Sequence, residues 1–197
     1  RKFRAAYAKN SGDRVFEVSR MLNEAGMSKG TTLSFQSMDE GVLEAVKRKN
    51  IGTKVFKELM GRYNMAGIPT YSELIIGLPG ETYDSFADGI DQLLNAGQHT
   101  GLSVYTCELL PNSEMNLPEY REKYGIQSIE VPVLFYHATP SDDPHAEVYE
   151  IVTATNSLSP EDWVRSQLFA WIVQACHCMG LTQVVAVFLK HHDGIPY

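Results

Sequence analysis

The chain has 197 residues, of which 44% are hydrophobic, and its formal net charge is -7 at pH 7. This composition supports one sizeable core, and the scattered lysines and arginines argue against a nucleic-acid-binding surface. No apolar run approaches the roughly 20 residues of a bilayer span, and the first residues lack the apolar stretch of a signal peptide, so we expect a cytoplasmic protein without a membrane partner.

Strand and helix patterns alternate over the first 110 residues. Short apolar or β-branched runs predict strands, and apolar residues at helical spacing between N-capping residues and glycines predict helices. The predicted strands are Phe3 to Ala8, Thr31 to Ser37, Leu74 to Ile76 and Leu102 to Leu110, and the predicted helices are Asp13 to Ala25, Asp39 to Lys49, Lys54 to Ala66 and Thr82 to Ala96. Such alternation is typical of parallel βα units, in a barrel or in an open sheet. We therefore expect an α/β fold.

The stretch from Gly67 to Thr82 organises the rest of the chain. The apolar run 74–76 predicts a strand that is covered on both faces. Residues 77–80, Gly-Leu-Pro-Gly, then end the strand, Thr82 is a candidate N-cap, and Glu81 places a carboxylate at the positive end of the next helix dipole. The loop is either a plain strand-to-helix turn or a place where backbone N–H groups hold a nucleotide or a carboxylate.

The pattern changes after Asn112, where the alternation stops. We expect a short helix at Pro118 to Tyr124 and two extended segments, Val131 to His137 and Val148 to Thr155. A long helix at Ser159 to Gly180 and a last apolar run at Val184 to Leu189 follow. The extended segments form a hairpin or extend the sheet. The long helix is apolar around much of its surface, so it lies against the sheet or against a missing part of the molecule. We predict a domain over residues 1–117 and a C-terminal α+β extension over residues 118–197.

Candidate binding residues lie where predicted strands end, because parallel strands bring their carboxyl ends to one rim. Alternate residues of a barrel strand face the lumen, so an inward Glu73 would bring Ile75 and Gly77 onto the same line. A half-exposed Glu73 near a strand end is an equally good interpretation. Gln36 and Ser37 end an earlier strand, and their neutral groups suit ribose or amino-acid recognition better than acid–base chemistry.

The three cysteines are an odd number without framework spacing, which argues against a secreted disulfide scaffold. Cys176 and Cys178, with His177 between them, suggest a metal site. Residues two apart on a helix point to different sides, however, so we expect ordinary buried cysteines and no metal.

Three motifs together resemble the second half of the radical S-adenosylmethionine (SAM) domain. They are the run Gly77 to Thr82 after an apolar strand, the strand Leu33 to Ser37 about forty residues earlier, and the turn Leu109 to Ser113. The finer similarity is to the cobalamin-binding radical SAM proteins, in the residues Gln36-Ser37-Met38 and the helix of residues 42–50. The resemblance covers residues 3 to about 117.

This resemblance implies a six-stranded (β/α) partial barrel, of which this chain supplies about four parallel strands. In that family a four-iron four-sulfur cluster reductively cleaves SAM to start radical chemistry, and an N-terminal domain holds cobalamin. On the matching positions it implies Gln36 and Ser37 beside the ribose, Ile75 and Gly77 at the adenine, and the backbone after Val104 at the other adenine edge. The full set of candidates is Asn10, Gln36, Ser37, Glu73, Ile75, Gly77 and Val104.

The sequence departs from the family pattern, because the Cys-x-x-x-Cys-x-x-Cys motif, the first two strands and the glycine-rich methionine-binding element are missing. We therefore expect part of a larger radical SAM enzyme that is inactive alone and has the rest of the same protein as its partner. The open edge of the first strand would pair with another copy or be covered by the C-terminal region. Two alternatives stay open, a cluster-free nucleotide-binding or regulatory module and a purely structural domain.

Overall fold

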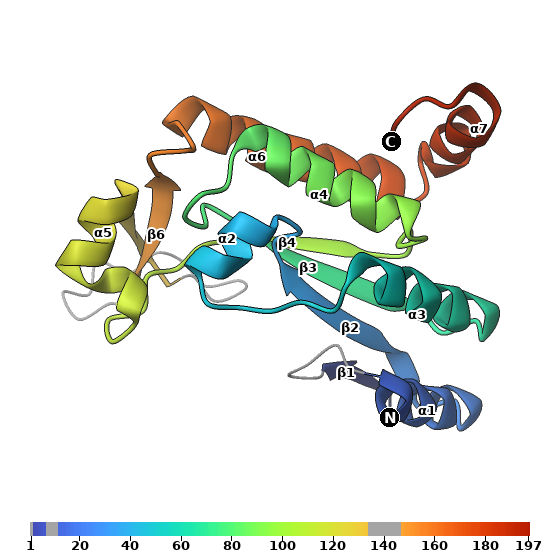
Figure 1. Ribbon diagram of the computed structural model, residues 1–197. Coiled ribbons are helices and arrows are strands. Elements are labelled where there is room, and N and C mark those ends of the chain that lie inside the picture. The colour runs from blue at the N-terminus through green and yellow to red at the C-terminus, as the bar shows by residue number, and fades with distance from the viewer. Residues whose placement is uncertain (1, 7–11, 134–146) are drawn as a thin grey trace.

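Four parallel strands form the main sheet, in the order β1-β2-β3-β4 (Figure 1). The computed structural model describes residues 2–6, 12–133 and 147–197. Its elements are β1 (Phe3–Ala6), α1 (Gly12–Glu24), β2 (Ser28–Gln36), α2 (Glu40–Ala45), α3 (Thr53–Met65), β3 (Thr70–Ile76), α4 (Tyr83–Asn95), β4 (Leu102–Thr106), η1 (Glu114–Asn116), α5 (Pro118–Tyr124), β5 (Gln127–Pro132), β6 (Val148–Ala154), α6 (Pro160–Ile172), the π-helix η2 (Val173–Cys178) and α7 (Gln183–Asp193). The prediction of an α/β fold with a parallel sheet is confirmed.

The main core lies between this sheet and helices α3, α4 and α6. Burial alternates along β3, so that Leu74 and Ile76 are buried while Glu73 and Ile75 are half-buried. The core cluster includes Leu33, Phe35, Leu74 and Ile76 from the strands and Phe56, Leu59, Phe86, Ile90, Leu93 and Ala170 from the helices. The prediction that β3 is covered on both faces is therefore wrong, because the helices bury only one set of its alternating side chains.

The fourth strand is shorter than predicted. It ends at Thr106 instead of Leu110 because the backbone changes its hydrogen-bond partner there. The N–H group of Cys107 still donates to the oxygen of Ile76 at 2.8 Å, but the N–H group of Leu109 donates to the oxygen of Glu150 in β6, also at 2.8 Å. The segment after β4 thus connects the main sheet with the C-terminal part of the chain.

Two further bounds differ from the predicted ones. Helix α2 ends at Ala45 instead of Lys49, because Lys47 has a φ of +54°, which a right-handed helix does not allow. Strand β2 begins at Ser28 instead of Thr31, because Ser28 and Gly30 already pair with β1. Both differences depend on backbone geometry that residue type specifies weakly.

Strands β5 and β6 form a separate antiparallel hairpin. The hairpin prediction is confirmed, and the alternative that these strands extend the main sheet is wrong. Strand β5 begins at Gln127, earlier than the predicted segment Val131 to His137, and residues 134–137 of that segment lie outside the described residues. The hairpin meets the main sheet through a bridge between Glu108 and Ile151.

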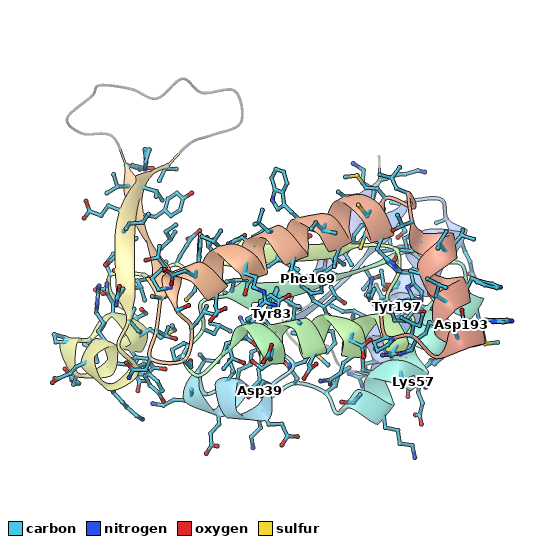
Figure 2. All side chains as sticks on the ribbon, turned by 90° about the horizontal axis from the view of Figure 1, so that it is seen from above. Asp39, Lys57, Tyr83, Phe169, Asp193 and Tyr197 are labelled. Atoms are coloured by element: carbon cyan, nitrogen blue, oxygen red, sulfur yellow. The ribbon has the colours of Figure 1, made fainter. Side chains whose placement is uncertain are left out.

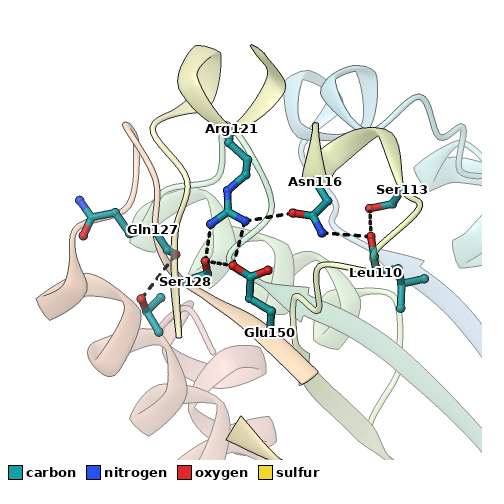
Figure 3. Close-up of polar contacts among 8 residues, drawn as sticks. Leu110, Ser113, Asn116, Arg121, Gln127, Ser128 and Glu150 are labelled. Carbon is teal, nitrogen blue, oxygen red and sulfur yellow. Dashed lines mark hydrogen bonds and ion pairs between the residues drawn. The ribbon is translucent and has the colours of Figure 1, made fainter. Parts of the chain in front are cut away.

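Helix α5 is attached to the hairpin by Arg121 (Figure 3). Its guanidinium group donates to Glu150 Oε1 at 2.8 Å, to Ser128 Oγ at 2.6 Å and to Asn116 Oδ1 at 3.0 Å. The hydroxyl of Ser128 also donates to Glu150, and these hydrogen bonds, that from Ser128 first, lower the pKa of the Glu150 carboxyl group. The arginine therefore connects α5, η1 and both strands of the hairpin.

Helix α6 packs one face against α4 and exposes another. Tyr83 and Phe169 meet edge to face between the two helices, with ring centroids 6.1 Å apart (Figure 2). Exposed apolar residues at helical spacing follow the other side of α6, namely Val164, Leu168, Trp171 and Ile172. Within the described ranges α6 is therefore buried on one side only, and the prediction that it also lies against a missing part of the molecule stays a prediction. No single described helix is long and apolar enough to cross a membrane, and α6 with η2 passes that test only together with α7, across a bend of 93°.

A contact between two histidine rings connects η2 to the loop after α4. The Nδ1 atom of His99 lies 2.9 Å from Nε2 of His177, and Gln183 Nε2 donates to the backbone oxygens of both residues, at 2.9 Å and 3.2 Å. Burial lowers the pKa of both imidazoles, which favours a neutral pair in which one ring donates to the other. This contact holds the start of α7 beside the loop between α4 and β4.

Replacement of Phe35 by alanine is expected to lower the free energy of unfolding by about 3–5 kcal/mol. The ring is fully buried and meets Phe56 edge to face at 4.6 Å, so its removal leaves a cavity in the core. Urea denaturation measures the change. The matched control is Phe188→Ala on α7, where the ring is 57% exposed and the expected change is below about 1 kcal/mol. Equal losses in the two variants would contradict this placement of the core.

Candidate functional site

A polar row and an apolar row lie side by side on the face of the sheet that carries Glu73 and Ile75, which we call the open face. Ser34, Glu73 and Ser103 are register partners across β2, β3 and β4, and the Ser34 hydroxyl donates to the Glu73 carboxylate. Two residues further along, Ile75 pairs with Tyr105, whose side chain is 54% exposed. The structure thus brings Glu73 and Ile75 together near the carboxyl ends of the strands.

Gly77 follows β3 with a φ of +93°, a conformation that favours glycine. A Cβ atom on it would lie 3.4 Å from atoms of Val152 in β6, which is ordinary contact. Val152 is fully buried in a second apolar cluster together with Val42, Leu78 and Cys107. The hairpin therefore packs against the backbone at Gly77, and the contact of Gly77 with adenine stays a prediction.

Gln36 and Ser37 lie at the end of β2, as predicted, but in different environments. Gln36 is half-buried, has a φ of +67° and sits at an irregularity in the register with β3. Ser37 is 2% exposed, and its hydroxyl donates to Glu81 Oε1 at 2.8 Å and accepts from the N–H group of Asp39 at 3.1 Å. Its one donor hydrogen is therefore used inside the protein, and its place beside a ribose stays a prediction.

The side chain of Val104 does not lie on the open face. Val104 pairs with Leu74 and packs against the main core, whereas the next residue, Tyr105, belongs to the open face. The prediction concerned the backbone after Val104, which does reach the row formed by Ile75 and Tyr105. Asn10 lies outside the described residues.

Glu81 is buried, unlike the carboxylate expected at the start of a helix. Its side chain is 2% exposed, and within the described part of the chain its Oε2 atom has no hydrogen-bond partner. Burial is the main reason that the pKa of Glu81 is raised to about 8. The hydrogen bond from Ser37 lowers the pKa by a smaller amount, and the negative charge of Asp39 raises it. At neutral pH the group is a protonated acid, not the expected carboxylate at a helix dipole. Its only sequence signal is its place after Pro79-Gly80, between a strand and a helix start.

A hollow of about 830 Å³ lies beside this region, between α2, Gly80 and α5. Acidic side chains contribute much of its lining, among them Asp39, Glu44 and Glu114. Of the predicted binding residues that the structure describes, none lines it, so this hollow and the open face are separate features.

The cysteines do not fit an iron–sulfur cluster. Cys107 is buried after β4, where burial raises the pKa of its thiol to about 12, whereas Cys176 and Cys178 are half-buried in η2. Cluster ligation requires converging thiolates. Among the described residues no three His, Cys, Asp or Glu side chains are arranged to hold a metal ion.

The buried acid predicts a pH dependence of stability. The pKa of Glu81 rises from its usual 4.5 to about 8 on folding, so between these values the unfolded chain binds fewer protons than the folded one. The stabilising contribution is fully present below about pH 4.5 and is lost as the pH rises to about 8. Glu81→Gln cannot ionise, so over this pH range its free energy of unfolding should fall by a few kcal/mol less than that of the wild type. Each pKa unit corresponds to roughly 1.4 kcal/mol. Urea denaturation across this range measures it, with Glu58→Gln on the exposed side of α3 as control, and identical slopes in wild type and Glu81→Gln would refute the assignment.

The comparisons with known proteins agree with this fold. No protein-family model matches the sequence. The chain is 45% identical over 198 residues to the cobalamin-dependent radical SAM methyltransferase TokK of Streptomyces tokunonensis, and 43% identical over 195 residues to the 2-(S-pantetheinyl)-carbapenam-3-carboxylate methyltransferase of Streptantibioticus cattleyicolor. These matches cover 100% and 98% of this chain but only 29% and 28% of the two relatives.

The fold is shared with a solved radical SAM methyltransferase. TsrM from Kitasatospora setae, in a structure with tryptophan and a SAM analog, matches 86% of this chain and 35% of its own with a TM-score of 0.58 and 17% identity. Its structure with cobalamin and a [4Fe-4S] cluster matches with a TM-score of 0.55. This chain is thus homologous over its whole length to part of a cobalamin-dependent radical SAM methyltransferase, which confirms its resemblance to the cobalamin-binding members of the radical SAM superfamily.

Proposed function

We propose that residues 1–117 of this chain form the C-terminal half of the radical SAM domain of a methyltransferase and contribute the ribose and adenine part of its SAM site. The observation that carries this proposal is the 45% identity with TokK over the full length of the chain. A regulatory or purely structural module is not favoured, because both curated relatives are methyltransferases. In this proposal the four strands are part of a (β/α) partial barrel, residues 1–117 belong to it, and residues 118–197 extend it.

The open face supports nucleoside binding by its chemistry. The row of Ser34, Glu73 and Ser103 offers hydroxyl and carboxylate oxygens that suit ribose hydroxyl groups. The adjacent Ile75 and Tyr105 offer apolar surface to a base. The two rows together offer polar groups for a ribose and apolar surface for an adenine, which are the two parts of an adenosyl group.

The proposed parent enzyme uses SAM, a [4Fe-4S] cluster and cobalamin, as the names of TokK and the TsrM structures indicate for those proteins. When bound, the cluster supplies the electron that cleaves SAM. Because the cysteines of this chain do not converge, we infer that the cluster is held outside residues 1–197. This chain alone would then bind the adenosyl group without turning SAM over.

A chimera tests the proposal. The matching segment of TokK is replaced by this chain, and SAM consumption is measured in the chimera and in its Glu73→Ala variant. We expect turnover in the chimera and a KM for SAM that rises roughly tenfold in the variant, the cost of one hydrogen bond to a charged group. Glu58→Ala, an exposed change on α3, is the control and should leave KM unchanged. If the chimera is active and Glu73→Ala leaves its KM for SAM unchanged, Glu73 does not belong to the SAM site.

A further inference from the structure

One buried residue connects three loops at the ends of the strands. Ser37, in the loop between β2 and α2, donates to Glu81 Oε1 at 2.8 Å, and Ser157, in the loop between β6 and α6, donates to the backbone oxygen of Glu81 at 2.8 Å. The N–H group of Asp39 donates to the Ser37 hydroxyl at 3.1 Å. Glu81 thereby joins segments that lie 44 and 76 residues away in the sequence.

The second carboxyl oxygen makes this connection depend on a proton. Oε2 of Glu81 is buried without a hydrogen-bond partner in the part of the chain that the structure describes. An ionised carboxylate would therefore bury a negative charge that the hydroxyls of Ser37 and Ser85 offset only in part, which is costly. The charged group that faces it is Asp39, at the start of α2, and its negative charge opposes ionisation further, whereas α4 and the β6–α6 loop face it with the hydroxyls of Ser85 and Ser157.

We propose that Glu81 is a positioning residue of the nucleoside site, whose protonated carboxyl group holds the loops after β2 and β3, and with them Gln36 and Gly77, in the arrangement that binds the ligand. Ionisation of Glu81 releases these loops. Glu81 does not contact the ligand, because its side chain is 2% exposed. The inference rests on the proposed function, in which the ligand is the adenosyl part of SAM.

Binding of 5′-deoxyadenosine to the 197-residue chain tests the proposal, because this probe carries no group that titrates between about pH 6.5 and about pH 9. Isothermal titration at both values compares wild type with Glu81→Gln, Glu81→Ala and Ser37→Ala. We expect the affinity of the wild type to fall about fivefold or more at the higher pH. Glu81→Gln, which cannot ionise, should bind equally at both values, and the two alanine variants should bind weakly at both. Glu58→Gln is the control and should behave like the wild type. A wild-type affinity that does not change with pH would overturn the proposal.

Two further measurements test whether Glu81 connects these loops, and neither depends on the binding of 5′-deoxyadenosine. Infrared spectroscopy should show the carbonyl band of a protonated carboxylic acid in the wild type at about pH 6.5, and this band should be absent from Glu81→Gln. Amide hydrogen exchange should become faster in residues 37–42 and 77–82 of the Ser37→Ala variant. A wild type that shows this band but binds no 5′-deoxyadenosine would refute the proposed function alone. A missing band, or unchanged exchange in these two loops, would refute the role of Glu81.

Discussion

The packing of helices on one face of a parallel sheet is the constraint on which the rest of this structure depends. Parallel strands require crossover connections, and α3 and α4 supply the crossovers around β3. Their apolar residues bury Leu74 and Ile76 and leave Glu73 and Ile75 half-buried on the opposite side. The open face therefore exists because the helices pack against only one set of the alternating side chains. The surface at which we propose binding thus follows from the same alternation that builds the core.

The C-terminal residues are packed into both apolar clusters. Leu158, Ala170 and Val173 belong to the main core, and Ile126 and Val152 complete the second cluster with Val42 and Leu78. Residues 118–197 thus pack against the sheet at its helix-covered face and at the ends of its strands. The division at residue 117 stays a prediction, since contact between two segments does not by itself decide a domain boundary.

Glu81 shows how a residue type acquires its chemistry from its surroundings. A glutamate beside a helix N-terminus is normally an exposed anion that favours the helix. Here Ser37 donates to its carboxyl group from a loop 44 residues earlier, and Ser157 donates to its backbone oxygen from the loop between β6 and α6. The resulting burial raises its pKa to about 8 and changes it from a surface charge into a neutral hydrogen-bonding group.

Local features were predictable because the interactions that make them span only a few residues. Thr82 caps α4 in a capping box with Ser85, Asp39 caps α2, and Ser159 caps α6, as short polar residues before helical patterns indicate. The sequence likewise indicated β3, the glycine turn after it and the placement of Glu73 and Ile75 on one face, because strand geometry alternates with period two.

Contacts between distant segments decided the rest. The early end of β4, the separate hairpin and the burial of Glu81 all depend on partners that lie tens of residues away, and so does the pairing of His99 with His177 across 78 residues. The Gly77 backbone likewise meets Val152 from a strand that no local pattern placed there. Periodicity and capping thus determined the α/β elements and the strand-end position of the candidate site. Only the tertiary packing determined which side chains remain available there and which carboxyl group keeps its proton, since burial is a property of the assembled chain.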